Sequence, residues 1–280
     1  MYQALLLISE LTFHEAKRRR TFWLAGGLGF LFIALYALGF FFVYKEMRQS
    51  LPKGFDLALT SGFSFFLTAG FYGISFLGVM LAVLASATVF AGDIQSQTIQ
   101  LLATKPLPRH CIVLGKWLGL GVLLSIYISA LSLGLVLATY LIARYIPPNV
   151  FAGILLLIME ALVMLTIGIL AGTHLNMIGS GILSFMLYGL AFIGGWTEQI
   201  GSFSANETAT DIGILISLIV PSEAMWRMAS YLLQPPALRS LSLSPFSIAS
   251  APSLAMLLYT IIYIAGLLIW AIRTFAQRDL

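Results

Sequence analysis

Few residues of this 280-residue chain have the types and spacing that enzyme or metal chemistry needs. Cys111 is the single cysteine, which excludes an intrachain disulfide, and its neighbour His110 adjoins it in sequence only. Gly115 and Lys116 are followed by Trp117, where a Walker phosphate-binding loop requires Ser or Thr. The three histidines lack metal-ligand spacing, and neither a Gly-x-Ser-x-Gly elbow nor a His-Glu-x-x-His pair occurs. We therefore expect no ATPase activity, no catalytic residues, no metal site and no cofactor bound by this chain.

One carboxylate lies inside a long apolar segment. Glu160 is near the middle of the run 150–172. A charged group inside a membrane is costly and is by default a functional candidate, so Glu160 would belong to a substrate pathway or a gate. The alternative is a protonated acid that is hydrogen-bonded to a neighbouring helix, with Thr166, His174 or Tyr188 as partners.

The segment 197–253 contains two further candidates for a pathway or gate. Its apolar part is too short to span a membrane alone and is interrupted by Pro221, which predicts two short helices that dip in from the outer face. Glu223 and Arg227 lie one helical turn apart and can pair, either at the outer exit of a pathway or as a local surface ion pair. A seventh crossing through 212–233 would place both charges in mid-membrane, which is unfavourable.

A polar, helix-forming segment from Gly92 to Lys116 separates the apolar runs 63–90 and 112–141. A helix from Asp93 to Thr104 would place four side chains on one stripe, a pattern typical of a helix that lies in a groove of another protein. Its carboxylate would lie at the positive end of the helix dipole, and two prolines would end the helix. The stripe consists of Ile94, Thr98, Leu101 and Leu102, and the prolines are Pro106 and Pro108. We expect a soluble partner to bind this segment at a membrane face.

The composition predicts an integral membrane protein. Hydrophobic residues make up 60% of the chain and charged residues 9%, and the mean hydropathy is +0.97. Apolar runs of helical length predict an all-α protein rather than a barrel, with residues 1–280 forming a single transmembrane domain. Six membrane-spanning helices are predicted at about 22–44, 63–90, 112–141, 150–172, 177–196 and 254–272.

Basic residues predict the orientation. Lys17 to Arg20 are four consecutive basic residues directly before the first span, which favours a cytoplasmic amino terminus. With six crossings both termini are cytoplasmic, and nine of the fifteen basic residues but four of the eleven acidic ones lie on that side. Residues 1–21 alternate apolar and polar faces at helical spacing, which predicts a helix that lies in the headgroup region.

Small residues recur at a spacing of four, which lets helices approach closely. Generic packing within one chain and a seam between two copies are both consistent with this pattern. The pairs are Gly115 and Gly119, Ser125 and Ser129, and Gly168 and Gly172.

The polar segment resembles the corresponding region of the ABC-2 class of ATP-binding-cassette permeases. In that class an acidic residue, a Gly-Thr, a Leu-Leu, and then Pro, Arg and Gly-Lys join the second and third spans. Asp93 stands here in place of the usual Glu, and Gln97 in place of the usual Gly. The matching residues are Asp93, Thr98, Leu101, Leu102, Pro106, Arg109, Gly115 and Lys116. Within the class, the segment is most similar to permeases grouped with the nitrous-oxide-reductase copper-maturation system, a grouping that leaves the cargo open.

The resemblance implies an exporter subunit driven by a separate ATPase. It implies a cytoplasmic coupling loop over 91–111, short extracytoplasmic helices before the last span, and a bacterial or archaeal cytoplasmic membrane. Two ATPase subunits, which bind ATP and Mg²⁺, would dock beneath a homodimer of this chain in membrane lipid, and no nucleic acid is involved. The ATPase-coupling residues would be Asp93, Ile94, Gln97, Thr98, Leu101, Leu102, Pro106, Arg109 and Lys116.

Two other functional classes remain open at this level. A channel or ion-coupled carrier would work without ATP. An intramembrane enzyme would need convergent catalytic groups, for which only Glu160 and His174 are candidates.

Overall fold

All regular structure in the described residues is helical. The computed structural model describes residues 2–50, 56–95, 108–204, 206–236 and 253–277. Six of its helices are long and apolar enough to cross a membrane, which confirms the predicted number. They are α2 (Arg20–Ser50), α3 (Asp56–Ala85), α6 (Arg109–Ala143), α7 (Val150–His174), α8 (Met177–Phe203) and α12 (Leu254–Gln277). Each of the six has at least 24 residues, more than the roughly 20 that a hydrocarbon core requires.

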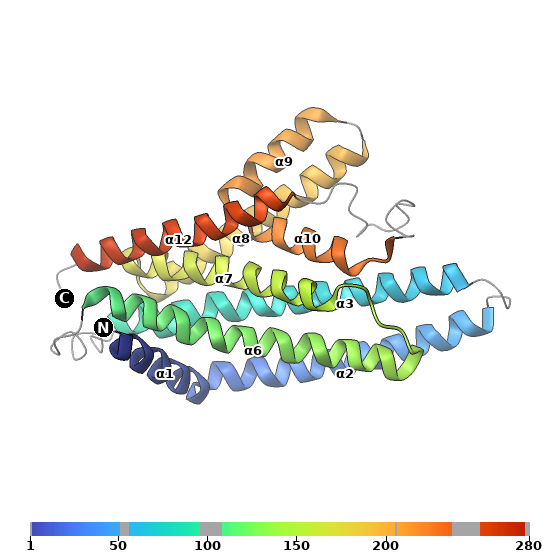
Figure 1. The fold of residues 1–280 in the computed structure, drawn as a ribbon, viewed down its shortest axis with the longest axis horizontal. Coiled ribbons are helices and arrows are strands. Elements are labelled where there is room, and N and C mark those ends of the chain that lie inside the picture. The colour runs from blue at the N-terminus through green and yellow to red at the C-terminus, as the bar shows by residue number, and fades with distance from the viewer. Residues whose placement is uncertain (1, 51–55, 96–107, 205, 237–252, 278–280) are drawn as a thin grey trace.

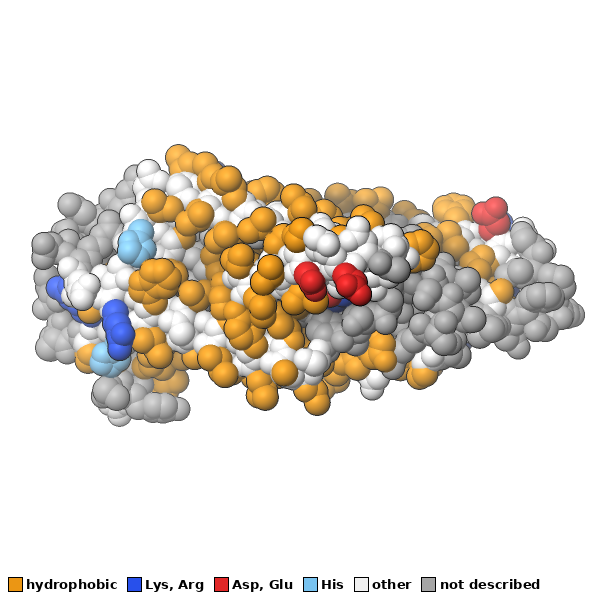
Figure 2. Space-filling model, turned by 90° about the horizontal axis from the view of Figure 1, so that it is seen from above, with side chains coloured by type: hydrophobic (Ala, Val, Ile, Leu, Met, Phe, Trp, Pro, Cys, Tyr) orange, Lys and Arg blue, Asp and Glu red, His pale blue; other side chains and the backbone are white. Residues whose placement is uncertain are grey.

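The long helices form an elongated bundle with α7 among its core elements (Figure 1). α7 packs against α3, α6, α8 and α12, and α3 and α7 are the most buried of the six. α2, α8 and α12 expose most of their apolar side chains, and hydrophobic groups cover much of the face seen in Figure 2. This distribution suits a lipid surrounding, in which apolar surface need not be buried in protein. Both ends of the described chain lie at one end of the bundle, here called the basal end (Figure 1).

The turns between the long helices follow local sequence signals. α6 ends at Ala143, and the residue that follows, Arg144, is in the left-handed conformation with φ 55°. Two prolines follow, and α7 begins after Asn149, which is also left-handed with φ 51°. α8 is capped by Asn176, whose side chain accepts a 2.8 Å hydrogen bond from the backbone N–H of Gly179. These short connections hold α6, α7 and α8 as antiparallel neighbours.

The amino-terminal helix α1 (Tyr2–Arg18) is packed against α6 (Figure 1). Ile8 and Thr12 are buried in this contact. A Cβ added at Gly115 would lie 2.7 Å from the Cβ of Ile8, and one added at Gly119 would lie 2.5 Å from the carbonyl oxygen of Ser9. This glycine pair therefore serves packing within the chain. Leu6, Leu7 and Leu11 of α1 are exposed, so a further apolar face points away from the bundle.

Two shorter helices, α9 (Glu207–Ile219) and α10 (Ser222–Leu233), lie between α8 and α12. They are bent by 109° at a break that includes Pro221, so 212–233 is not one straight helix. α9 packs on α8, and α10 packs against α7, α8 and α3. The hydroxyl of Tyr263 donates a 2.8 Å hydrogen bond to the carbonyl of Ile219, which satisfies a group at the end of α9.

Candidate functional site

The third helix changes its winding as it approaches the basal end. Residues Ser86–Ala91 form a π-helix, η1, followed by one α-turn, α4 (Gly92–Gln95). The backbone N–H of Gly92 bonds to the carbonyl of Ala87, five residues earlier. The hydroxyls of Ser86 and Thr88 donate to carbonyls of the preceding turn, a competition with the helix ladder that bends or widens helices. Single-turn π segments occur frequently at functional sites.

Gly168 and Gly172 hold this π-helix against α7. A Cβ at Gly168 would collide with the side chain of Ser86, and one at Gly172 would lie 3.1 Å from the Cβ of Ala91. Both glycines therefore allow η1 to approach α7 closely. The second glycine pair, like the first, makes its close contacts inside one chain.

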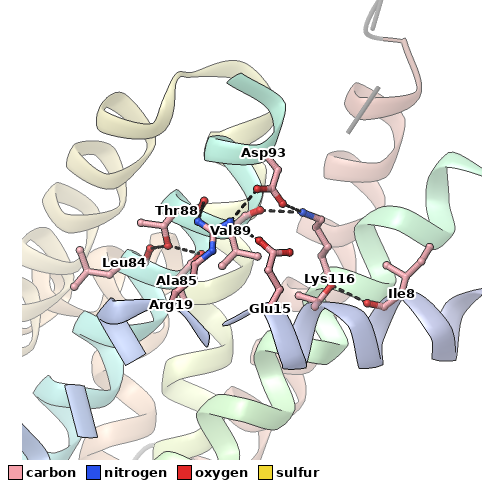
Figure 3. Close-up of polar contacts among 10 residues, drawn as sticks. Ile8, Glu15, Arg19, Leu84, Ala85, Thr88, Val89, Asp93 and Lys116 are labelled. Atoms are coloured by element: carbon pink, nitrogen blue, oxygen red, sulfur yellow. Dashed lines mark hydrogen bonds and ion pairs between the residues drawn. The ribbon is translucent and has the colours of Figure 1, made fainter. Parts of the chain in front are cut away.

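Two basic side chains bind the carbonyl groups of the π-helix. Nη1 of Arg19, at the corner between α1 and α2, donates a 2.8 Å hydrogen bond to the carbonyl of Thr88. Nζ of Lys116, on α6, donates a 2.9 Å hydrogen bond to the carbonyl of Val89. Asp93 joins the two cations: its Oδ1 accepts from Arg19 at 3.0 Å, and its Oδ2 pairs with Lys116 (Figure 3).

Glu15 completes this group by pairing with Arg19 one turn later on the chain (Figure 3). We call Glu15, Arg19, Asp93 and Lys116 the basal ion cluster. Its two cations and two carboxylates balance, which lowers the cost of keeping Asp93 and Lys116 almost fully buried. Burial would lower the pKa of Arg19, but Glu15 and Asp93 outweigh this effect and raise the pKa above its usual value, so this charge is permanent.

The structure brings together only two of the predicted coupling residues. Asp93 and Lys116 come together, although they are 23 residues apart. Arg109 lies elsewhere and donates a 2.8 Å hydrogen bond to the carbonyl of Ala276 in α12. Ile94 is helical, within α4. Gln97, Thr98, Leu101, Leu102 and Pro106, with most of the predicted helix to Thr104, lie outside the described residues.

A second polar group lies inside the bundle. Glu160 is 1% exposed, and the hydroxyl of Ser75 on α3 lies 2.8 Å from both of its carboxyl oxygens. The sequence suggested Thr166, His174 or Tyr188 as partners, but the Thr166 hydroxyl donates to the carbonyl of Leu162 at 2.7 Å, and His174 is exposed at the end of α7. Ser75 is therefore the polar partner that the structure gives to this carboxyl group.

Arg227 forms an ion pair with Glu198 of α8. Glu223 and Arg227 are each 5% exposed, so the expectation of a surface ion pair is wrong. α10 turns these side chains inward against α7 and α8. Glu223 lies beside Gly195, where a Cβ would collide with its side chain. We call Ser75, Glu160, Glu198, Glu223 and Arg227 the buried polar cluster.

The comparison with known families decides the class of the protein. A family model described as ABC-2 family transporter protein matches residues 6–280, nearly the whole chain. The chain belongs to the ABC-2 transporter family. No curated relative matches it with significant similarity. Members of the ABC-2 family are membrane-spanning transport subunits, in general not enzymes, and work with an ABC ATPase.

The geometry of this ABC-2 subunit gives no support to an intramembrane enzyme. Glu160 and His174 are on the same helix, 14 residues apart, which separates them by about 21 Å along the axis. His174 is exposed at the end of α7, whereas Glu160 is buried. Within the described residues no group of three or more His, Cys, Asp or Glu side chains could hold a metal ion.

Sequence reasoning missed four residues that the ABC-2 fold brings into these clusters, namely Glu15, Arg19, Ser75 and Glu198. Arg19 was assigned only to the basic run that orients the chain. Its four-residue spacing from Glu15 was a usable signal for an ion pair. Ser75 carried no signal, because a serine in an apolar run is a common helix-packing residue.

Proposed function

We propose that this chain is the membrane subunit of an ATP-driven exporter in a bacterial or archaeal cytoplasmic membrane, with both termini in the cytoplasm. Two copies form the pathway as a homodimer in membrane lipid. Two separate ATPase subunits, which hold ATP and Mg²⁺, dock at the basal end. The resemblance of the segment from Asp93 to Lys116 is what supports a grouping with the nitrous-oxide-reductase copper-maturation permeases, and this grouping leaves the cargo open. The observation that carries the proposal is the family match over residues 6–280.

The basal ion cluster supports a role in force transmission. The segment after Gln95, expected to bind the ATPase, continues directly from η1 and α4. Asp93 is tied through Arg19 to α1 and through Lys116 to α6. A push on the coupling segment therefore reaches three helices through short, charged contacts rather than through one helix alone. Packing of η1 on α7 extends the connection to the core.

The buried polar cluster is our candidate for the pathway or gate, with Glu160, Glu223 and Arg227 as its members of interest. Its support is the burial of all three side chains and the ion pair that links α10 to α8. An ionisable group in the membrane interior is costly, so it is by default a candidate for a functional role. Movement of α10 relative to α8 would break this ion pair and change the charge exposed to a cargo.

Co-purification with the cognate ATPase tests the coupling segment. We expect Leu101→Asp together with Leu102→Asp to abolish complex formation and to return ATP turnover to that of the ATPase alone. Leu238→Asp with Leu241→Asp, in the segment expected on the opposite side, is the matched control. Unchanged complex formation and turnover in the Leu101 and Leu102 variant would reject this segment as the docking element.

Two further measurements separate the proposal from the other functional classes. Thr98→Cys in a Cys111→Ser background should react with a membrane-impermeant maleimide only after the cytoplasmic face is opened. Reaction from outside would reverse the orientation. A channel or carrier predicts ion or solute flux in vesicles of the permease without ATP, whereas an exporter subunit alone should show none.

A further inference from the structure

The wide turn of η1 encloses one residue more than an α-helical turn. The backbone N–H of Gly92 bonds to the carbonyl of Ala87, whereas an α-helix would use the carbonyl of Thr88, one residue later. Residues Ser86–Ala91 include neither glycine nor proline, the two residues that most disfavour a regular helix. The wide winding therefore depends on contacts that other helices make with η1.

These contacts act on carbonyls that an α-helical winding would use differently. The carbonyl of Thr88 accepts from Arg19, and that of Val89 accepts from Lys116 (Figure 3). In an α-helix the same two carbonyls would accept from backbone N–H groups four residues later. Both cations also bind the carboxylate of Asp93. The basal ion cluster therefore holds η1 in its wide winding.

A change to α-helical winding would turn the chain after Gly92 relative to α3. One residue corresponds to about 100° of rotation in an α-helix. Such a rotation would carry the carboxylate of Asp93 away from Arg19 and Lys116, so both ion pairs belong to the wide winding. Rewinding of η1 and opening of the basal ion cluster are therefore a single event.

Glycines face η1 from two neighbouring helices, so no side chain at these positions opposes a change of winding. On α7 they are the two glycines described above. On α8, a Cβ added at Gly181 would lie 3.7 Å from the Cβ of Ala87. η1 also carries Phe90, whose ring centroid lies 6.0 Å from that of Phe275 in α12. A change of winding would therefore move a buried ring against α12 as well.

We propose that η1 is a two-state element of the coupling stroke, an inference that rests on the proposed export function. The basal ion cluster holds the wide winding in the absence of ATP. When the ATPase moves the segment after Gln95, the cluster opens, η1 rewinds as an α-helix, and Phe90 shifts against α12. Opening leaves the buried Lys116 without its carboxylate, so the wide winding is the stable one until ATP-driven movement supplies the difference.

Deletion of one residue tests whether the extra residue of η1 has a function. Removing Ala87 converts the wide turn into an α-helical turn and leaves the faces of α3 and α4 in register, so the chain should fold and bind the ATPase. Stimulated ATP turnover should fall about tenfold or more, because no residue remains to be rewound. Deletion of Ala69, in the regular part of α3, is the control. It turns one part of α3 by about 100° against the other and should greatly lower the thermal midpoint.

A reversible disulfide tests the movement itself. Ala87→Cys with Gly181→Cys, in a Cys111→Ser background, places two Cβ atoms at a separation that a disulfide permits. Mild oxidation of the full-length chain alone should link the pair, because η1 is then in its wide winding. In complex with the ATPase, the oxidised chain should lose stimulated turnover, and a reductant should restore it. Each single cysteine variant, treated in the same way, should keep its turnover.

The rate of linking reports the winding in each state of the complex. It should be about tenfold lower in the complex trapped with ATP and vanadate than in the nucleotide-free complex, because rewinding moves position 87 away from α8. Equal rates in the two states would overturn the inference, and so would full turnover of the oxidised chain or of the Ala87 deletion.

Two measurements need no ATPase and test the wide winding separately. A chain that does not link when oxidised alone, or an Ala87 deletion that unfolds as the Ala69 deletion does, would overturn the wide winding as the starting state. An unmodified chain that neither binds nor stimulates the ATPase would instead reject the proposed function.

Discussion

Nζ of Lys116 lies 2.9 Å from the carbonyl oxygen of Val89, which joins the beginning of α6 to the π-helical end of the preceding span. The same ammonium group pairs with Asp93. Lys116 therefore fixes the two ends of the segment 96–107, which lies outside the described residues, relative to each other. A force on that segment therefore acts on two helix ends that are joined through Lys116, rather than on two independent ends.

Removing one partner of this pair should destabilise the subunit more than removing both. Asp93→Asn leaves a buried ammonium without its carboxylate, and we expect a loss of about 3–5 kcal/mol. Lys116→Met, which keeps the length of the side chain, should cost a similar amount. The double variant should recover part of the loss, with a coupling energy of about 1–3 kcal/mol. Thermal unfolding midpoints in detergent measure each effect.

The exposed Lys45 supplies the control for these substitutions. Lys45→Met removes an exposed charge on α2 and should change stability by no more than about 0.5 kcal/mol. Additive losses in the double variant would contradict a direct interaction between Asp93 and Lys116. A decrease in stimulated ATP turnover at unchanged stability would locate the effect in coupling instead of folding.

The six spans could be predicted because apolar length alone specifies a membrane helix. Glu160 could be singled out for the same reason, since a carboxylate is conspicuous in such a run. Its partner could not be predicted, because Ser75 is 85 residues away and Thr166, His174 and Tyr188 are equally plausible from the sequence alone. The π-helix also has no sequence pattern of its own. It depends on hydroxyl groups that bond to the preceding turn and on Arg19 and Lys116, which arrive from other helices.

The contact between Ser75 and Glu160 leads to a prediction about function. Glu160→Gln keeps the shape of the side chain and can still accept from the serine hydroxyl, so stability should change by about 1 kcal/mol or less. If the side chain serves a pathway or gate, stimulated ATP turnover of the complex should fall about tenfold, because an amide can neither take up nor release the proton of a carboxyl group. Ser75→Ala should instead lower stability by about 1–3 kcal/mol. Full turnover in the Glu160→Gln variant would identify a packing role only.

The ion pair between Arg227 and Glu198 should hold α10 against α8. Arg227→Met and Glu198→Gln should each lower the thermal midpoint, and a double-mutant cycle should give a coupling energy of about 1–3 kcal/mol. Asp211→Asn is the control, because Asp211 is an exposed acid on the neighbouring α9. Its effect should add to that of Arg227→Met. Simple additivity in both cycles would mean that the ion pair contributes nothing to holding α10.

The position of α1 depends on the absence of a side chain at Gly119. A Cβ there would lie 2.5 Å from the carbonyl oxygen of Ser9, a backbone atom that can move only with the whole helix. Gly119→Ala should therefore destabilise the subunit by about 1–3 kcal/mol, and Gly119→Leu by more. Stimulated ATP turnover should fall as well, because α1 carries Glu15 and leads directly into Arg19.

Gly27 on α2 provides the comparison, because nothing lies within 4 Å of a Cβ added there. Gly27→Leu should be neutral or stabilising by up to about 1 kcal/mol, since leucine favours the helix. Limited proteolysis of α1 distinguishes local detachment from global unfolding: the Gly119→Leu variant should be cut within α1 while the rest of the bundle stays protected. If both leucine variants behaved alike, α1 would not be held through Gly119, and the basal ion cluster would have to keep its geometry without that contact.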